Sequence, residues 1–477
     1  MKERPSNQPR TVIDAQASSP RRGTLRRGGF AALVIICLGA LLAACGGGGS
    51  SDSTTGGGSA TTAGGGGEAG AAESSGGATS AVAGELKELL ATPAGEEAGE
   101  GVGIKVGALE PMTGGGAVYG EEGTKGFELA AEEIEAMGGP KFEFDIKDHK
   151  SGDAQAGIQA TREWGLEEIP VSLTSFQGDL GATFPNIEQY KIFSLDPSGG
   201  SSAANEGQPF FYGTRANQET ASVAGRIKFL REAYPEAKTL YYTAPDNGPA
   251  IDKAAEEAFD KAIAEYGFES VGKTITKAGT TDFSDLIGRL QSAKPDLVFT
   301  NIYSPDIAYL LKQAKAAGLD IPILGYDFVP EDSKIAGAAV SDYTFGVDYF
   351  GPTTPGNDWT EIFRKEFEAK YNSQPTQYAA NNYETTFVLW QLYRQILSEG
   401  GDAGNGEEWV KALEAEPSFP SLYGGNGTTL GVLEIDTKTH LVSKRAMGVY
   451  QAPTSESEPP KLLASFNLEA AEFKLAK

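Results

Sequence analysis

The fold can be predicted from residues 104–146, IKVGALEPMTGGGAVYGEEGTKGFELAAEEIEAMGGPKFEFDI. The apolar run at 104–109 predicts a buried strand, and a glycine-rich loop follows it. Apolar side chains then recur at intervals of three, four and seven residues, which predicts a helix over about 121–137. Gly-Gly-Pro at 138–140 ends this helix, and alternation at 142–146 predicts a second strand. This order indicates a βαβ unit of an α/β protein.

The same alternation of strands and helices continues along the chain. Further strands are predicted at 171–174, 191–195, 238–243, 269–275, 296–302, 321–324, 343–349, 430–435 and 443–451. Further helices are predicted at about 153–165, 217–233, 249–265, 282–292, 305–317, 356–371, 377–398 and 407–415. Strands that alternate with helices indicate parallel sheets with right-handed crossovers.

The length and the loops predict a ligand cleft between two lobes. About 375 of the 477 residues follow a glycine-rich N-terminal segment, which is too long for one core and fits two lobes of roughly 150–200 residues. In open α/β sheets, ligands bind outside the carboxyl ends of the strands. The loops after the predicted strands are polar and rich in glycine, three in each lobe, at 111–120, 175–179, 196–202, 244–248, 302–306 and 324–329.

The N-terminus has the pattern of an export signal. Arginine pairs at 21–22 and 26–27 precede an apolar run from Phe30 to Leu42, and small residues follow. This pattern is typical of a secretory signal peptide, here covering 1–44. A transmembrane anchor is the alternative, but the run of 13 residues is shorter than the ~20 that a spanning helix needs. Whether export follows the general or the twin-arginine route stays open.

The segment after the signal peptide predicts a membrane anchor and a tether. LAAC at 42–45 resembles the lipobox of bacterial lipoproteins. The resemblance implies a diacylglycerol on the Cys45 thiol and a place on the outer face of the bacterial cell membrane. The next residues are mostly Gly, Ser, Ala and Thr, which cannot bury enough apolar surface to fold. We expect a disordered tether over 45–101 that spans roughly 40 Å.

Composition excludes several classes of function. The formal net charge is −25, and loss of residues 1–44, with seven basic and two acidic residues, takes it to −30. A surface this acidic argues against nucleic acid as a partner. The two cysteines are Cys37, inside the signal peptide, and Cys45, so the folded part has no disulfide and no thiol chemistry. The two histidines, His149 and His440, are far apart and are expected at the surface, so we expect no metal, no cofactor and no catalytic triad.

Several motifs resemble the leucine/isoleucine/valine-binding proteins, the periplasmic solute receptors of branched-chain amino acid ABC transporters. VYG at 118–120, followed by AEEIEAMGG at 131–139, resembles the first helix of that family. The resemblance extends over about 103–452. Its other motifs are GTTDFS at 279–284, KPD at 294–296, LKQAKAAG at 311–318, FEAKY at 367–371, Pro375 and Tyr383.

The resemblance implies roles for five residues. In that family, backbone and hydroxyl groups hold the carboxylate of the amino acid, and an acidic side chain holds its ammonium. The matching positions assign the acidic role to Asp327 and the carboxylate loop to Ser198 and Gly200. They place Tyr303 in the pocket and Tyr119 on the cleft wall beside the side chain of the ligand. The alternatives are a turn-forming Asp327 in a surface loop and tyrosines that only pack.

The chain departs from the family pattern at other positions. Gln177 stands where the family often has a serine for the carboxylate, and Gly200 stands where a hydroxyl-bearing residue is frequent. Asn247 replaces an aromatic side chain that closes the cleft, and Ser151 and Phe176 stand near the usual disulfide. Gln177 and Asn247 are counted among the ligand-binding residues and make the cleft more polar. A polar amino acid, an amide or a non-amino-acid ligand therefore becomes plausible beside a branched apolar one.

The resemblance also implies an architecture. We expect an α/β protein of the periplasmic-binding-protein-like I fold, with two doubly wound lobes joined by a three-crossing hinge. The expected bounds are 103–218 plus 351–425 for lobe one, 219–350 plus 426–465 for lobe two, and 215–220, 345–352 and 425–430 for the crossings.

The expected function is capture without catalysis. A monomeric, lipid-anchored protein would bind an amino acid or a related small polar solute between closing lobes and deliver it to an ABC permease. One alternative is a ligand sensor of the same fold that is not coupled to transport. Another is an extracellular hydrolase, which requires a nucleophile with a base, and neither is visible in the sequence. The identity of the ligand and of the permease stays open.

Overall fold

The computed structural model describes residues 82–91, 99–175, 181–199, 205–216, 222–453, 455, 458–467 and 473–476. The predicted signal peptide, Cys45 and most of the predicted tether lie outside the described residues. Within these ranges, no helix is long and apolar enough to cross a membrane. Residues 82–89 form a helix, and its Leu86 is fully buried in the core, so the prediction of a tether without structure is wrong for this segment. Apolar burial of this kind stabilises a short helix that would not form alone.

The first sheet has five parallel strands in the order β2-β1-β3-β4-β5. The chain places β2 on one side of β1 and then β3 on the other side. The direction of strand order therefore reverses between β1 and β3, which is the topological switch point of the sheet. The strands are β1 (Gly103–Glu110), β2 (Lys141–Asp148), β3 (Val171–Thr174), β4 (Phe193–Asp196) and β5 (Phe211–Gly213). The helices between them are α2 (Ala117–Ala136), α3 (Ala154–Leu166) and α5 (Phe184–Tyr190).

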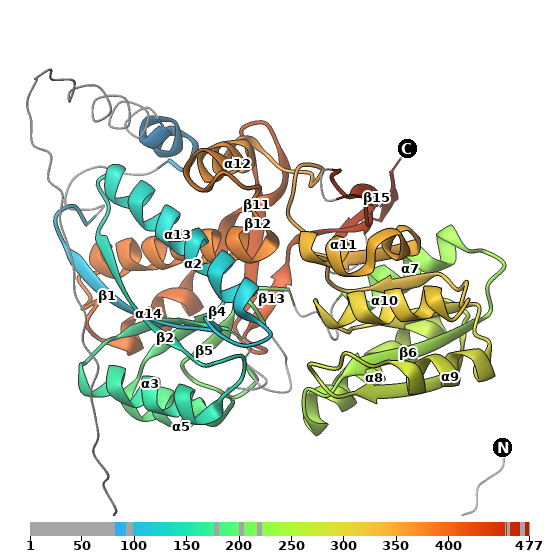
Figure 1. The fold of residues 1–477 in the computed structure, drawn as a ribbon. Helices are drawn as coiled ribbons and strands as arrows, with labels where there is room; N and C mark the ends of the chain where they lie inside the picture. Colours follow the sequence, from blue (N-terminus) through green and yellow to red (C-terminus); the bar gives the residue numbers. More distant parts are fainter. Residues whose placement is uncertain are drawn as a thin grey trace, which may run out of the picture. The chain divides into compact units, whose positions relative to one another are not determined.

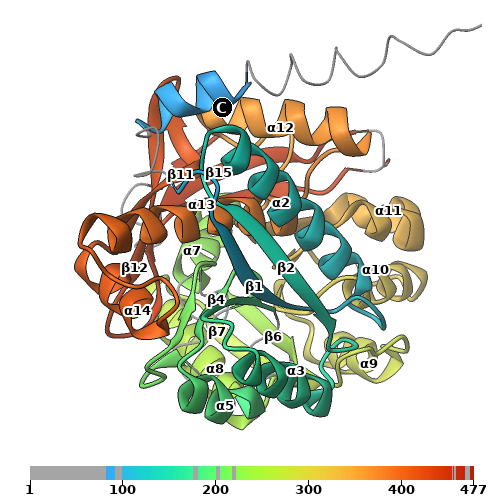
Figure 2. The same cartoon turned by 90° about the vertical axis from the view of Figure 1, so that its left-hand side faces the viewer.

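Helices cover both faces of this sheet (Figures 1 and 2). Helices α2 and α13 (Gln377–Ser398) lie on one face, and α3 and α5 lie on the other. Two glycines allow α2 to pack closely on α13 and β1 to pack closely on α3. A Cβ on Gly126 of α2 would lie 2.1 Å from the Ala379 carbonyl oxygen of α13, and a Cβ on Gly107 of β1 would lie 2.6 Å from the Trp164 indole of α3. This sheet therefore belongs to one packed lobe.

The second sheet has eight strands in the order β16-β15-β14-β10-β9-β8-β6-β7, and its switch point lies between β6 and β8. The parallel strands are β6 (Thr239–Pro245), β7 (Glu269–Thr276), β8 (Leu297–Thr300), β9 (Ile323–Gly325) and β10 (Tyr343–Val347). The antiparallel edge is β14 (Ala446–Gln451), β15 (Lys461–Asn467) and β16 (Lys474–Leu475). The helices are α7 (Val223–Ala233), α8 (Pro249–Glu265), α9 (Ser284–Ala293), α10 (Asp306–Ala316) and α11 (Pro330–Ala336).

A third, antiparallel sheet packs with the first lobe. It consists of β11 (Ser418–Asn426), β12 (Thr429–Asp436) and β13 (Leu441–Lys444). The amide of Gly213 in β5 donates to the His440 carbonyl over 2.8 Å, which ties this sheet to the first one. The helices α12 (Asp358–Tyr371) and α14 (Gly406–Ala415) complete the lobe. The Tyr371 hydroxyl donates to the Lys125 carbonyl of α2 over 3.0 Å.

Three connections join the two large sheets. The first runs from β5 to α7 through Arg215, the second leaves β10 at Asp348, and the third is Arg445 between β13 and β14. We expected the third connection at 425–430. Residues of β12 and β13 instead pair within the third sheet, and the chain enters the second sheet at β14. The limits of the two lobes as domains stay a prediction.

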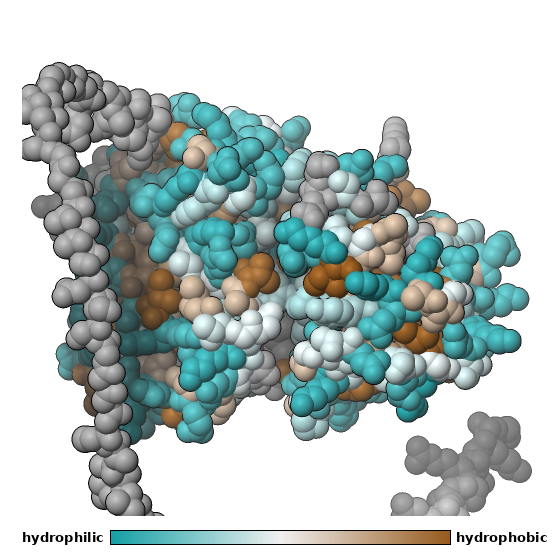
Figure 3. Space-filling view, viewed as in Figure 1, coloured by the Kyte–Doolittle hydropathy of each residue, from teal (hydrophilic) through white to brown (hydrophobic). Residues whose placement is uncertain are grey.

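The exposed face in Figure 3 is mostly hydrophilic, with hydrophobic residues in small separate patches. The exposed large hydrophobic side chains in the described part of the chain are Val102, Val118, Leu166, Val271, Val432 and Leu475. Scattered apolar residues of this kind are normal for a protein surface. The polar loops at the ends of the parallel strands are therefore the candidate functional site.

Candidate functional site

The described site residues that the sequence predicted follow strands of the two sheets or begin a helix beside them. Ser198 follows β4, and Tyr119 lies in the first turns of α2. On the second sheet, Asn247 follows β6, Tyr303 follows β8 and Asp327 follows β9. Gln177 and Gly200 lie outside the described residues. The carboxyl ends of parallel strands share one edge of a sheet, so each lobe presents polar side chains at one edge.

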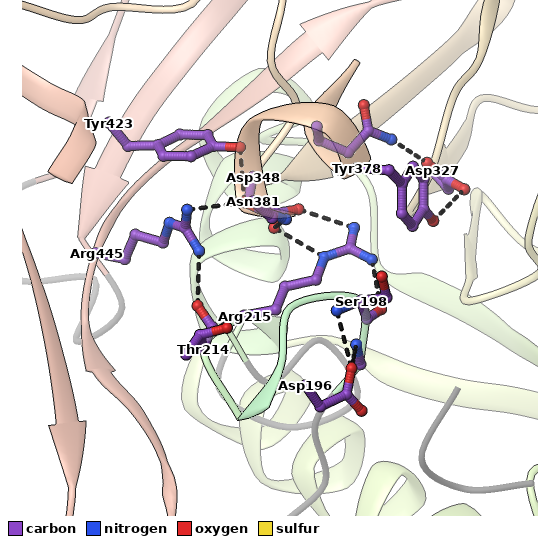
Figure 4. A network of polar contacts seen from close by, with 12 residues as sticks. Asp196, Ser198, Thr214, Arg215, Asp327, Asp348, Tyr378, Asn381, Tyr423 and Arg445 are labelled. Atoms are coloured by element: carbon purple, nitrogen blue, oxygen red, sulfur yellow. Dashed lines mark hydrogen bonds and ion pairs between the residues drawn. The ribbon is translucent and has the colours of Figure 1, made fainter. Parts of the chain in front are cut away.

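Asp327 is the point where groups from both lobes meet (Figure 4). Its carboxylate is 2% exposed. Oδ1 accepts from the Gln377 side-chain amide at 2.7 Å and from the Phe328 backbone amide at 2.9 Å. Oδ2 accepts from the Tyr378 hydroxyl at 3.1 Å and lies 3.3 Å from the Tyr119 hydroxyl. Since Tyr119, Gln377 and Tyr378 pack with the first sheet, these contacts link the two lobes.

Aromatic rings flank this carboxylate. The rings of Tyr119 and Tyr378 lie with centroids 4.4 Å apart, and both pack with Val329. The Tyr119 hydroxyl donates to the Ser304 carbonyl of the second lobe. Tyr303 is half-buried and meets Tyr326 edge-on at a centroid distance of 5.3 Å. Tyr119 therefore lies beside Asp327, whereas Tyr303 packs against Tyr326.

Burial and a nearby positive charge have opposite effects on the pKa of Asp327. Burial raises the pKa of its carboxyl above the ordinary 3.8, and the nearby charge of Arg215 partly opposes this shift. Asp332, in the first turn of α11, is also buried, and burial raises its pKa to about 7. The Asp332 carboxylate accepts from the Ser304 hydroxyl at 2.6 Å and from the Val329 amide at 2.9 Å. A cation that entered here would stabilise the charged form of both acids.

The loop that holds Ser198 is fixed from two sides. Asp196 Oδ1 accepts from the backbone amides of Ser198 at 2.9 Å and Gly199 at 2.8 Å. Arg215 Nη1 donates to the Ser198 carbonyl over 2.9 Å. The Ser198 hydroxyl is buried and has no hydrogen-bond partner within the described ranges. This donor is therefore available to a molecule that enters the cleft.

A buried network, which we call the crossing cluster, joins the three connections (Figure 4). Arg215 donates two hydrogen bonds to Asp348, from Nε to Oδ2 over 2.8 Å and from Nη2 to Oδ1 over 2.9 Å. Asn381 of α13 donates to Asp348 Oδ2 over 2.9 Å and accepts from Arg445 Nη2 over 2.7 Å. Its members are Arg215, Asp348, Asn381, Glu384, Tyr423 and Arg445. Each connection thus supplies one charged residue to a single cluster.

The charges of the crossing cluster are compensated. Burial alone would raise the pKa of Asp348, but the charge and hydrogen bonds of Arg215 hold it below the ordinary 3.8. Arg445 Nη2 donates to Glu384 Oε2 over 2.5 Å, and Nη1 donates to the Thr214 carbonyl over 3.0 Å. Bidentate pairs between an arginine and a carboxylate fix both distance and orientation. The cluster therefore sets how the three connections lie relative to one another.

Asn247 and the two histidines lie in other surroundings than the sequence predicted. The backbone amide of Asn247 donates to Asp252 of its own lobe over 3.0 Å, and no contact of Asn247 with Asp327 is present among the described residues. The expectation of surface histidines is wrong. His149 is fully buried, and its Nδ1 accepts from the Gly152 amide at 2.9 Å. His440 is 8% exposed and stacks on Tyr212 at 4.0 Å. Each imidazole ring is buried and forms a hydrogen bond within the protein instead of with water. Burial lowers the pKa of His149 to about 4.

Sequence reasoning missed Gln377, Tyr378 and Arg215, because it searched the loops after strands. A signal was present in α13. Polar residues recur at Gln377, Asn381 and Glu384, all of them buried, and this spacing places them on one face of the helix. Thr376 caps the helix by accepting from the Ala379 amide, which places the first turn beside Asp327. Within the described residues no cluster of His, Cys, Asp and Glu could hold a metal ion.

Two doubly wound lobes with polar groups facing each other across their strand ends define a two-lobed solute-binding protein. The chain belongs to the periplasmic binding protein family, whose sequence profile matches residues 103–448. A leucine/isoleucine/valine-binding protein homologue of Brucella melitensis is 25% identical over 332 residues, which cover 67% of this chain and 85% of the relative. The predicted family and the predicted fold class are confirmed.

Solved structures show the same fold. A branched-chain amino acid binding protein of Streptococcus pneumoniae in complex with isoleucine has a TM-score of 0.62 and 20% identity, and the match covers 75% of this chain and 99% of the other. A solute-binding protein of R. palustris in complex with benzoate has a TM-score of 0.65 and 20% identity, covering 79% and 98%. This fold therefore holds ligands of more than one chemical class.

Proposed function

We propose that this chain is the extracytoplasmic substrate-binding lipoprotein of an ABC importer, which captures an amino acid or a related small polar solute between its lobes. The observation that carries the proposal is Asp327. This buried carboxylate of the second lobe is surrounded by Tyr119, Gln377 and Tyr378 of the first lobe. A group bound there touches both lobes at once, which is what couples binding to closure.

The proposed binding mode follows from charge and hydrogen bonding. The ammonium of an amino acid would displace neutral donors from Asp327 and form a charge-assisted hydrogen bond with it. Gln377 and Tyr378 are uncharged, so they compete weakly with a cation for this carboxylate. The carboxylate of the ligand would meet the loop of Ser198 and Gly200, with Gln177 beside it. Tyr119, Tyr303 and Asn247 would contact the remainder of the ligand.

Delivery to a membrane permease is the second part of the proposal. The support is the lipobox that ends at Cys45 and the long tether that follows it. A lipid on Cys45 and the roughly 36 residues that precede the helix at 82–89 would hold the lobes at a root-mean-square distance of roughly 30–36 Å from the membrane surface. Ligand binding would shift the population toward the closed form, and the permease would recognise that form.

A thermal-shift panel of amino acids, amides, aromatic acids and short-chain acids tests capture. A ligand at 100 times its dissociation constant stabilises the folded protein by ~2.7 kcal/mol. Isoleucine and benzoate are the informative pair, because both carry a carboxylate and only isoleucine carries an ammonium. We expect Asp327→Asn to abolish binding of the best amine. A panel without any hit contradicts capture of a small solute, and hits confined to compounds without an amine contradict the ammonium role of Asp327.

A further inference from the structure

Glu110 is a buried acid at the switch point of the first sheet. It is the last residue of β1, and β1 pairs with β3 so that Leu109 lies opposite Thr174. The switch point between two such strands is where open α/β sheets bind ligands. Glu110 has no exposed surface, and neither of its carboxyl oxygens has a hydrogen-bond partner among the described residues. No role in the proposed binding mode above has been given to it.

The surroundings of Glu110 come from several elements. On α2, a Cβ placed on Gly123 would lie 3.5 Å from Glu110 Oε2 and 2.8 Å from the side-chain nitrogen of Asn382 on α13. Gly123 therefore packs closely against both polar groups. After β3, the Ser175 hydroxyl donates to the Leu109 carbonyl over 3.1 Å and lies 3.1 Å from His149 Nε2. These two contacts engage the Ser175 hydroxyl, which also lies close enough to Glu110 to lower its pKa.

Other buried polar atoms at this edge also have no partner within the described ranges. They are Thr174 Oγ1 at the end of β3, Ser198 Oγ after β4 and Asn382 Oδ1 on α13. An unsatisfied buried polar group is rare in folded proteins, and leaving one unpaired costs about 1–3 kcal/mol. Several at one strand edge, next to a loop of the proposed cleft, indicate a site whose partners come from a bound molecule.

The charge state of Glu110 limits what that molecule can offer. Burial raises the pKa of Glu110 well above the ordinary 4.5, and the charge of Asp196 adds to this shift, while the Ser175 hydroxyl opposes it. The arginine beside the Ser198 loop, Arg215, is already paired with Asp348. An uncharged carboxylic acid has one O–H donor. With the Ser198 hydroxyl, the edge then presents two neutral donors to an acceptor oxygen.

We propose that Glu110 is a ligand-binding residue that donates a hydrogen bond, together with Ser198, to a carboxylate oxygen of the solute. This inference rests on the proposed function, since it concerns how the captured solute is recognised. It assigns the solute to the carboxylates and gives the two ends of the cleft different tasks. Asp327 of the second lobe would bind a positively charged group of the solute, and Glu110 of the first lobe would bind its carboxylate.

Isothermal titration of the mature protein with isoleucine and with benzoate tests the proposal, using Glu110→Gln and Glu110→Leu. Glutamine keeps a donor of nearly the same shape, so we expect binding within about threefold of wild type, whereas leucine should weaken it by about tenfold or more. The proposal is overturned if both variants bind like the wild type, or if Glu110→Gln abolishes binding, which would indicate a charged Glu110 paired with a cation.

A pH series supplies a second readout that a merely structural role would not move. Affinity of the wild type for the carboxylate should fall as rising pH removes the proton of Glu110, and affinity of Glu110→Gln should stay level. The titratable groups that face this region are Asp196 on β4 and His149 after β2, while α2 and α13 present the uncharged Gly123 and Asn382. Equal pH profiles of the two proteins would overturn the proposal, and this comparison still decides the matter if Glu110→Leu fails to fold.

The failure of this inference is distinguishable from failure of the proposed function. Binding of an amine or amide without a carboxylate, together with no binding of either probe, overturns the role of Glu110 and leaves solute capture intact. No binding by the wild type to any compound of the panel overturns both. Asp285→Ala on α9 is the control, since this exposed residue lies outside the proposed site and its loss should leave the binding of both probes unchanged.

Discussion

Asp348 and Glu110 are two fully buried carboxyl groups with opposite surroundings. Asp348 accepts three hydrogen bonds, two from the Arg215 guanidinium and one from Asn381, and its pKa is lowered. Glu110 has no hydrogen-bond partner within the described ranges, and its pKa is raised. Burial is the same in both cases, so the partner decides the charge. One acid is paired within the connections between the lobes, and the other is buried without a hydrogen-bond partner at the end of β1.

The largest effect on stability is expected when Asp348, the acid with three hydrogen bonds, is removed. Asp348→Ala leaves the Arg215 guanidinium buried without its partner, so we expect the free energy of unfolding to fall by about 3–5 kcal/mol. Urea denaturation at neutral pH measures it. Because the pKa of Asp348 is lowered in the folded state, its stabilisation is present above pH 3.8 and is lost as pH falls through the folded-state pKa.

An exposed pair serves as the matched control. Arg289 and Asp285 lie one helical turn apart on α9, with a 2.8 Å contact between Nε and Oδ2. Both side chains face solvent, so Asp285→Ala should leave the midpoint of the urea transition unchanged. A comparable loss in the two variants would show that the buried cluster has no special role.

The second effect is on pH dependence and has the opposite sign. Glu110 keeps its proton in the folded state at pH values where the unfolded chain has lost it, so its contribution to stability is complete below about pH 4.5 and is lost as pH rises toward its folded-state pKa. Glu110→Gln removes this loss. The variant should therefore gain stability over the wild type by up to ~1.4 kcal/mol per pH unit above pH 4.5.

Thermal unfolding of both proteins from about pH 4.5 to pH 8 measures this difference. Other buried acids, such as Glu133 with a pKa of about 8, titrate in both proteins and cancel in the comparison. A difference that does not change with pH would mean that Glu110 has the same charge in the folded and unfolded states.

The smallest effect concerns Asp327, whose partners are neutral. Tyr378→Phe removes one hydroxyl donor to this carboxylate and keeps the ring that packs against Tyr119. We expect a loss of about 0.5–1.5 kcal/mol in the free energy of unfolding without ligand. Binding of an amine should be preserved, because the ammonium takes the place of the hydroxyl. Loss of amine binding in this variant would show that Tyr378 holds the ligand itself.

The regular parts of the fold could be predicted from sequence because periodicity and end signals agree. The helix predicted at 249–265 is α8 with the same bounds, and the helix predicted at 377–398 is α13. The first helix begins earlier than predicted, at Ala117, since the glycine-rich loop continues directly into its first turn. The missed elements are short or irregular. Strand β5 has three residues, and β11 contains Pro420, Gly424 and Gly425, which hide its alternation.

The site was only partly predictable for a related reason. The family resemblance points to Ser198, Tyr303 and Asp327, and these residues lie in loops that follow parallel strands. Arg215 and Tyr378 come from a connection and from a helix start, and their contacts join segments far apart in sequence. Single-sequence patterns record local periodicity and do not record which distant segments meet.

The central claim is that a solute bound between the lobes closes them. The predicted mature chain has no cysteine after Cys45, so Glu121→Cys on α2 and Glu331→Cys on α11 can be labelled as a pair of exposed sites in a Cys45→Ala background. Energy transfer between the labels, measured with and without the strongest hit of the panel, reports the distance across the cleft. We predict a shorter distance with ligand and no change in Asp327→Asn with an amine. An unchanged distance in a protein that binds its ligand would contradict the claim.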